Sequence, residues 1–120
     1  MAAVRWRGNA STELKTMKLL RENKITGWRR HLPIFGHPDF AFPKSRVALF
    51  IDGCFWHGCP RCYHAPQSSK AFWRAKIQRN MRRDLKVSRG LRRRGWKVLR
   101  VRECQLKTPE RFLARLKLCV

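Results

Sequence analysis

The chain has 120 residues, and its 29 Lys and Arg against 7 Asp and Glu give a formal net charge of +22. This charge is typical of a protein that binds a polyanion, most simply nucleic acid, although a solvated basic surface, a ribosomal-type structural protein and a binder of anionic membranes stay open as alternatives. The hydrophobic content of 43% argues against a disordered basic tail. The length predicts a single domain over residues 1–120, and the lack of a long apolar run or a signal-peptide pattern predicts that it is cytoplasmic.

The first predicted element is a helix. Ser11 is a suitable N-cap for a helix that runs to Asn23. Its apolar face is predicted from residues at helical spacing: Leu14, Met17 and Leu20. Glu13 falls in the first turn, where a carboxylate interacts favourably with the helix dipole, and this is the simplest interpretation of that residue from its position alone.

Three short strands are predicted next. Residues 28–31 are a candidate strand, followed by a loop rich in proline and glycine. Residues 39–42 and 47–51 are apolar runs separated by a short turn, so they predict a hairpin. Asp39 lies where the loop meets the second strand.

The end of the 47–51 run is the most informative position in the chain. Asp52 and Gly53 stop the strand, and His57 follows shortly after. Catalytic groups in α/β proteins are commonly displayed at strand ends. We therefore expect Asp52 and His57 to contribute to a reactive site.

The second half of the chain predicts a long helix, a strand and a last helix. The long helix is expected from Ser69 to Gly95. Its buried stripe is predicted from Phe72, Trp73, Ile77, Met81, Leu85 and Leu91. A strand is expected at residues 96–102, ending near Glu103 and Cys104.

In the last helix, Thr108 is the predicted N-cap and Pro109 the first helical residue. Its apolar face is predicted from Phe112, Leu113, Leu116 and Cys119. The order of elements is that of a compact α/β domain. Trp28 and Trp96 are expected to be core residues.

The cysteines predict a structural metal site. Cys54, Cys59 and Cys62 follow the central strand, and Cys104 follows the later one. Four thiolates suit tetrahedral zinc, and closing such a site would supply folding free energy to a small core. Cys119 has the spacing of the last helix and is expected to be a half-buried free thiol.

Several ordered motifs carry a family resemblance. They are Pro38-Asp39-Phe40, Asp52-Gly53-Cys54-Phe55-Trp56-His57, the helix with Phe72, Trp73, Lys76, Asn80 and Asp84, and Gly95-Trp96-Lys97-Val98-Leu99 before Glu103-Cys104. With these motifs the chain resembles the very short patch repair (Vsr) endonucleases of the PD-(D/E)xK superfamily. The resemblance implies a restriction-endonuclease-like α/β core, a small mixed sheet flanked by helices, with a structural zinc site.

The resemblance also implies an active site. Asp39 would bind a catalytic Mg²⁺ together with the main-chain carbonyl of Ile51. His57 would handle a proton at the attacking water, as a near-neutral imidazole can. Asp52 would bind metal-bound water or orient a neighbour, and Glu13 would act at the water or metal site instead of only compensating the helix dipole.

The remaining implied roles concern zinc and DNA. The zinc ligands would be Cys54, Cys59, Cys62 and Cys104, with a cysteine in place of the family's histidine at Cys59. The residues implied to intercalate beside a mismatched base pair are Phe55, Trp56 and Trp73, although a tryptophan on a helix stripe is more often a core residue.

The implied activity is nicking of double-stranded DNA at T:G mismatches, 5′ to the thymine, by a monomer with a short N-terminal arm at residues 1–10. A relaxed-specificity nuclease of the same fold and an inactive zinc-stabilised nucleic-acid-binding module are the alternatives.

Overall fold

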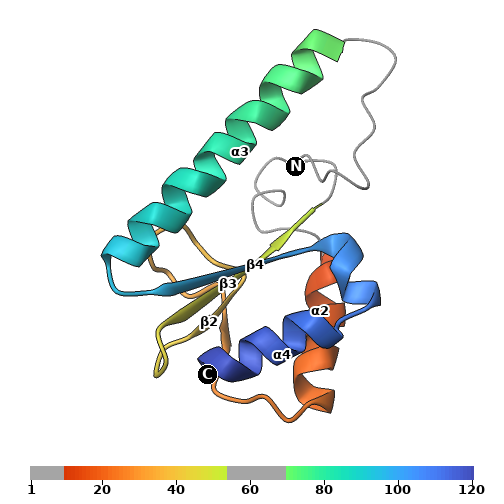
Figure 1. Ribbon diagram of the computed structural model, residues 1–120, viewed down its shortest axis with the longest axis vertical. Helices are drawn as coiled ribbons and strands as arrows, with labels where there is room; N and C mark the ends of the chain where they lie inside the picture. The colour runs from red at the N-terminus through yellow and green to blue at the C-terminus, as the bar shows by residue number, and fades with distance from the viewer. Residues whose placement is uncertain (1–9, 54–69) are drawn as a thin grey trace.

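The structure, a computed structural model, describes residues 10–53 and 70–120. The described residues form a four-stranded sheet, and Figure 1 shows helices on both sides of it. In chain order the elements are α2 (Ala10–Glu22), β1 (Arg29–Arg30), β2 (Phe40–Phe42), β3 (Val47–Asp52), α3 (Lys70–Arg93), β4 (Lys97–Arg102), the 3-10 helix η1 (Glu103–Lys107) and α4 (Glu110–Cys119). The predicted α/β class and the order of the elements are confirmed, whereas η1 was not predicted.

The sheet is mixed, with the order β1-β2-β3-β4. β1, β2 and β3 pair antiparallel, and the hairpin of β2 and β3 was predicted. β3 and β4 pair in parallel, with Asp52 opposite Arg102. Parallel neighbours need a long crossover, which α3 supplies. The carboxyl ends of β3 and β4 therefore lie together at one edge of the sheet.

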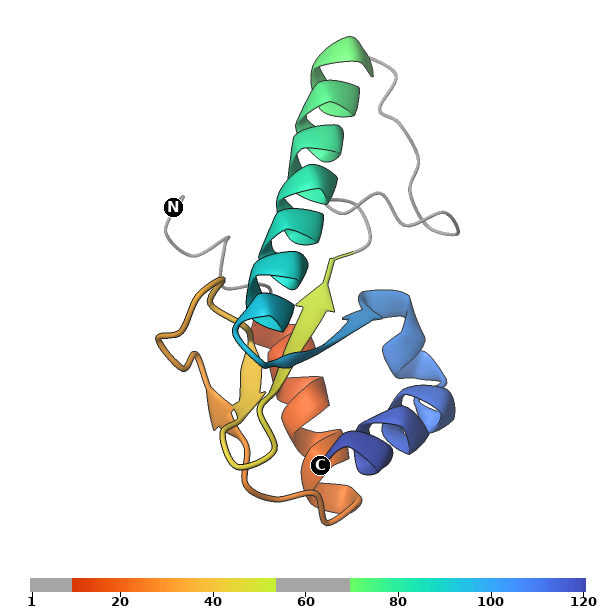
Figure 2. The same ribbon diagram turned by 60° about the vertical axis from the view of Figure 1, so that its left-hand side comes forward.

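The two faces of the sheet have separate apolar clusters, because strand side chains alternate between faces. Leu49 and Ile51 belong to the larger cluster, which also contains residues of α2, η1 and α4. Ala48 and Phe50 belong to the smaller one, which includes Leu91 of α3. Figures 1 and 2 show the same layers, with α2 and α4 on one side of the sheet and α3 on the other. Trp28 and Trp96, which were predicted to be core residues, are half-buried and pack against these clusters.

The predicted buried stripe of α3 is only partly correct. Ile77 and Leu91 are buried, but Phe72, Met81 and Leu85 are 55%, 44% and 58% exposed. Figure 2 shows that α3 extends far beyond the sheet, so the first turns of the helix, which include Phe72, have no strand beneath them. Helical spacing identifies an apolar face but not how much of the helix has a partner.

The ends of the helices explain the smaller differences. α2 begins at Ala10, one residue before the predicted N-cap. Leu14 is 59% exposed instead of buried, because α2 turns the side that carries Glu13, Met17 and Leu20 inward. In α4, Pro109 occupies the N-cap position predicted for Thr108, and the helix begins at Glu110. Shifts of this size are common at helix ends.

Two helices end in the same hydrogen-bond motif. At the end of α3, Gly95 has a φ of 86°, its N–H donates to the carbonyl of Arg92, and Trp96 donates to the carbonyl of Leu91. This is the Schellman motif, which favours glycine at the left-handed position. At the end of α2 the same position is occupied by Lys24, with a φ of 56°. The predicted role of Gly95 as the end of the helix is confirmed.

Candidate active site

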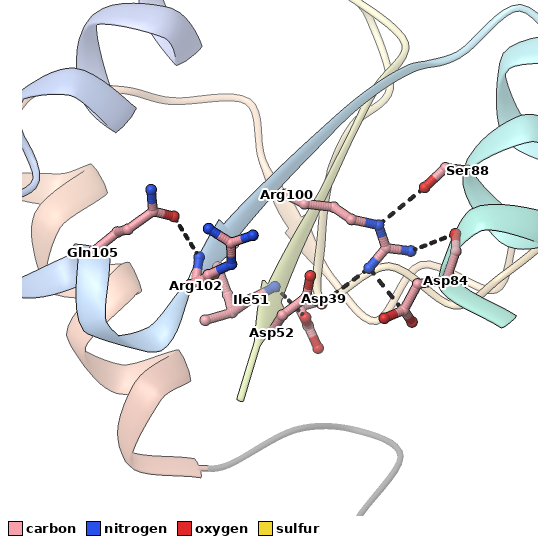
Figure 3. Close-up of polar contacts among 8 residues, drawn as sticks. All are labelled: Asp39, Ile51, Asp52, Asp84, Ser88, Arg100, Arg102 and Gln105. Carbon is pink, nitrogen blue, oxygen red and sulfur yellow. Dashed lines mark hydrogen bonds and ion pairs between the residues drawn. The ribbon is translucent and has the colours of Figure 1, made fainter. Parts of the chain in front are cut away.

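Asp39 is the centre of the candidate site. It directly precedes β2 and is only 7% exposed, and its Oδ2 accepts a hydrogen bond from the main-chain N–H of Ile51 at 2.7 Å (Figure 3). Burial, with a smaller contribution from the nearby carboxylates of Glu13 and Asp52, raises the pKa of Asp39 to about 7. The Ile51 hydrogen bond and the Arg100 charge act in the opposite direction. A buried carboxylate among other carboxylates is stabilised by a bound cation.

Ile51 places a main-chain oxygen on the same side as this carboxylate. In a β-strand the N–H and C=O of one residue point to the same side of the strand. Since the N–H of Ile51 points to Asp39, its carbonyl faces the Asp39 side as well. These are hard oxygen donors, and Mg²⁺ is usually held by one or two carboxylates with water and substrate phosphate completing its shell. The donor set fits Mg²⁺.

Residues 10–53 and 70–120 contain no group of three or more His, Cys, Asp or Glu side chains arranged to hold a metal ion.

Glu13 is held beside Asp39 by the end of β1. Its carboxylate is buried in the first turn of α2 and accepts hydrogen bonds from Arg30 at 2.7 Å and from His31 Nε2 at 3.0 Å. His31 has a φ of 52°, and its main-chain N–H donates to the carbonyl of Asp39 at 3.2 Å. His31 thus joins the two acidic residues.

The sequence did not reveal the roles of Arg30 and His31. Residues 28–31 predicted a short strand without indicating what its side chains contact. A signal was present in hindsight, because a glutamate on the buried side of a helix requires a basic or hydrogen-bonding partner.

Asp52 contacts a different partner, on the α3 side of the sheet. Its Oδ1 accepts a hydrogen bond from Arg100 Nη1 at 2.9 Å. The same guanidinium donates to Ser88 Oγ at 2.9 Å and to the carbonyl oxygen of Asp84 at 3.2 Å, both on α3 (Figure 3). The sequence did not single out Arg100. The available signal was a charged residue between two buried residues of the same strand.

α3 presents a basic surface. Arg82, Lys86, Arg89 and Arg93 are exposed and recur at intervals of three or four residues, so they lie along one side of the helix. Such a row is suited to a phosphate backbone.

Several predicted site residues lie outside the residues that the structure describes. They are Cys54, Phe55, Trp56, His57, Cys59 and Cys62. Cys104 is described, half-buried in η1 directly after β4. Trp73 is half-buried near the start of α3, in an edge-to-face contact with Phe72 at 5.2 Å. The structure therefore brings Asp39, Ile51 and Glu13 together, with Asp52 at the adjoining strand end.

The topology is that of an α/β protein with a small mixed sheet flanked by helices. This fits the predicted restriction-endonuclease-like core. The family profile described as DNA mismatch endonuclease Vsr matches residues 1–64. The chain belongs to this family, as its motifs predicted.

Known relatives agree with this assignment. The chain is 47% identical over 66 residues to the type II nicking enzyme V.NaeI of Lentzea aerocolonigenes, covering 55% of this chain and 40% of the relative. It is 41% identical over 91 residues to the type II nicking enzyme V.XorIIP of Xanthomonas oryzae pv. oryzae, covering 74% and 65%. It is 40% identical over 79 residues to the DNA mismatch endonuclease Vsr of Escherichia coli K12, covering 64% and 50%. The chain spans about half the length of the relatives it matches.

Among the helices of the described residues, none combines the length and the apolar character needed to cross a membrane.

Proposed function

We propose that this protein is a Mg²⁺-dependent DNA endonuclease that nicks duplex DNA at T:G mismatches, on the 5′ side of the thymine. Its task would be very short patch repair of deaminated 5-methylcytosine. The observation that carries the proposal is Asp39, a buried carboxylate beside the main chain of Ile51 in a chain with a net charge of +22. The acidic site suits a metal ion, and the surrounding charge suits a polyanion.

In this proposal Asp39 and the carbonyl of Ile51 hold the Mg²⁺. The ion, when bound, polarises the scissile phosphate and lowers the pKa of a water molecule. His57 accepts the proton of the attacking water. Glu13, fixed by Arg30 and His31, accepts a hydrogen bond from water at the metal site.

A structural zinc ion would be held by Cys54, Cys59, Cys62 and Cys104. The register of the parallel strands supports this assignment. Asp52 lies opposite Arg102 at the ends of β3 and β4, and in the sequence a cysteine follows each of these residues two positions later. Zinc there would connect the two strand ends and add folding free energy.

The DNA would lie along the basic side of α3. Arg82, Lys86, Arg89 and Arg93 would contact its phosphates. Phe55, Trp56 and Trp73 would insert beside the mismatched pair, where stacking offsets the cost of separating the bases. We propose a monomer that acts in the cytoplasm on the DNA of the nucleoid.

The test is a nicking assay with an end-labelled duplex that contains one T:G mismatch and a matched T:A duplex, each with and without Mg²⁺. We expect Mg²⁺-dependent nicking of the T:G duplex alone, 5′ to the thymine. Asp39→Asn should lose nicking but keep binding, whereas Glu22→Gln, an exposed carboxylate on α2, should behave as the unchanged protein.

Three results would contradict parts of the proposal. Equal nicking of both duplexes would show a relaxed nuclease. Binding without cleavage, unchanged in Asp39→Asn, would show a nucleic-acid-binding module. Purified protein without bound zinc would exclude the four-cysteine site.

A further inference from the structure

Arg100 makes an unusually complete set of contacts for a strand residue. Its guanidinium uses Nε for Ser88, Nη1 for Asp52 and Nη2 for the main-chain oxygen of Asp84. It also lies 4.1 Å from the ring centre of Phe50 and forms a longer ion pair, 3.7 Å, with the carboxylate of Asp84. The side chain is 22% exposed. A planar guanidinium with each nitrogen engaged holds one orientation.

These contacts join the catalytic edge of the sheet to α3. Asp52 is the last residue of β3 and directly follows Ile51, whose main chain contacts Asp39. Asp84 and Ser88 lie one helical turn apart on α3, the helix with the basic side. Figure 3 shows Arg100 between these two groups. A shift of Arg100 would therefore move the end of β3 relative to the helix that contacts DNA.

The contacts of Asp52 also point to its role. Its side chain lies on the Phe50 side of β3, by strand alternation, and its Oδ1 accepts from Arg100 at 2.9 Å. Asp39 in turn accepts from the main chain of Ile51. The two carboxylates thus have separate partners, one a guanidinium and the other a main-chain N–H.

We propose that Arg100 is a positioning residue for the nicking reaction, and that Asp52 acts as its acceptor and not as a metal ligand. The Arg100–Asp52 pair fixes the last residues of β3, and with them the carbonyl of Ile51, while Asp84 and Ser88 fix α3 to the same guanidinium. This inference rests on the proposed function, since it assigns a role within that reaction.

The test is a double-mutant cycle with Arg100→Met and Asp52→Ala, measured in single-turnover nicking of the T:G duplex. Met retains an apolar stem over Phe50 but removes every donor. We expect each single variant to lower the rate constant about thirtyfold with duplex affinity within about threefold, because displaced reacting groups slow chemistry without removing phosphate contacts. The double variant should be no slower than the singles, since both remove one interaction.

Conservative variants separate the roles of the two side chains. Asp52→Asn keeps an oxygen acceptor for Nη1, so it should recover most of the rate lost in Asp52→Ala. Arg100→Lys keeps the charge but cannot reach all three acceptors, so its rate should lie between those of the wild type and Arg100→Met. Arg94→Met is the matched control, because Arg94 also stacks on an aromatic ring, 4.0 Å from Phe35, but lies away from Asp52. It should nick at the wild-type rate.

Mg²⁺ binding gives a second measurement that does not depend on nicking. The rise in the thermal unfolding midpoint on adding Mg²⁺ should persist in Asp52→Ala and disappear in Asp39→Asn. Loss of the rise in Asp52→Ala but not in Arg100→Met would overturn the assignment, because Asp52 would then act at the metal independently of Arg100.

The free energy of unfolding is measured for the same four proteins, which are the wild type, Arg100→Met, Asp52→Ala and the double variant. Additive effects on the rate, or an Asp52→Asn variant as slow as Asp52→Ala, would overturn the positioning role. Coupling seen in unfolding but not in nicking would show that the pair stabilises the fold alone, and would overturn it as well. A wild-type protein that does not nick the T:G duplex would instead contradict the proposed function.

Discussion

Replacing Asp39 with asparagine should stabilise the metal-free protein, and more so as the pH rises. The pKa of Asp39 is raised from 3.8 to about 7 in the folded protein. The folded state therefore binds the proton more tightly than the unfolded state, and stability falls as the pH rises between these two values. Asparagine resembles the protonated carboxyl, keeps an oxygen for the N–H of Ile51, and removes the cost of ionising a buried group.

The magnitude follows from the size of the shift. A change from 3.8 to about 7 corresponds to ~4 kcal/mol at full ionisation, since a tenfold change in proton affinity is about 1.4 kcal/mol. Between about pH 5.5 and about pH 8.5, the advantage of Asp39→Asn over the wild type should grow by about 2 kcal/mol. This is a large part of the stability of a small domain.

The assay is urea unfolding in magnesium-free buffer at several pH values, followed by tryptophan fluorescence. Glu22→Gln is the matched control, because it removes one carboxylate from an exposed position on the same chain. Its effect should not change with pH in this range. An Asp39→Asn advantage that is equally independent of pH would refute the reasoning, since Asp39 would then not ionise against the cost of burial.

Three further predictions concern helix ends, DNA binding and zinc. Lys24 and Gly95 both have a positive φ at the end of a helix, a conformation that favours glycine. Lys24→Gly should therefore raise the free energy of unfolding by about 1 kcal/mol, and Gly95→Ala should lower it by a similar amount. Thermal unfolding of both variants checks this. Arg89→Gln should weaken binding to T:G and T:A duplexes equally and reduce the salt dependence of the logarithm of the affinity by about one, measured by fluorescence anisotropy at several salt concentrations. Cys104→Ser should lower both bound zinc and the unfolding midpoint, whereas Cys119→Ser, on the far helix, should leave zinc content unchanged in metal analysis.

The sequence was sufficient for those features that depend on local patterns. The hairpin of β2 and β3, the strand β4 and the glycine end of α3 follow from alternation and from turn residues, which act over a few neighbours. The exposure of Phe72 could not be predicted, because it depends on how far the sheet extends beneath α3. Periodicity gives the direction of a face and says nothing of its partner.

The site shows the same division. Asp39 and Glu13 were expected at one site from the family resemblance, and the structure brings them close enough for the charge of Glu13 to raise the pKa of Asp39. Arg30, His31 and Arg100 were missed, because each reaches its acidic partner across strands or between a strand and a helix. The contact of Arg100 with Asp52 joins residues 48 positions apart, which no local pattern encodes.

The charges of the site explain why Asp39 is the carboxylate suited to a cation. The net charge of +22 would by itself favour the ionised form of every carboxylate. The pKa of Asp39 is nevertheless raised, so burial outweighs the long-range field of the basic residues, which salt screens beyond about 8 Å. Glu13 has Arg30 and Asp52 has Arg100 as ion-pair partners, whereas among the described residues no Lys or Arg pairs with Asp39. Glu13 and Asp52 still raise the pKa of Asp39 in spite of their arginine partners, so negative charge gathers around Asp39, and a divalent ion between the protein and a phosphate would offset it.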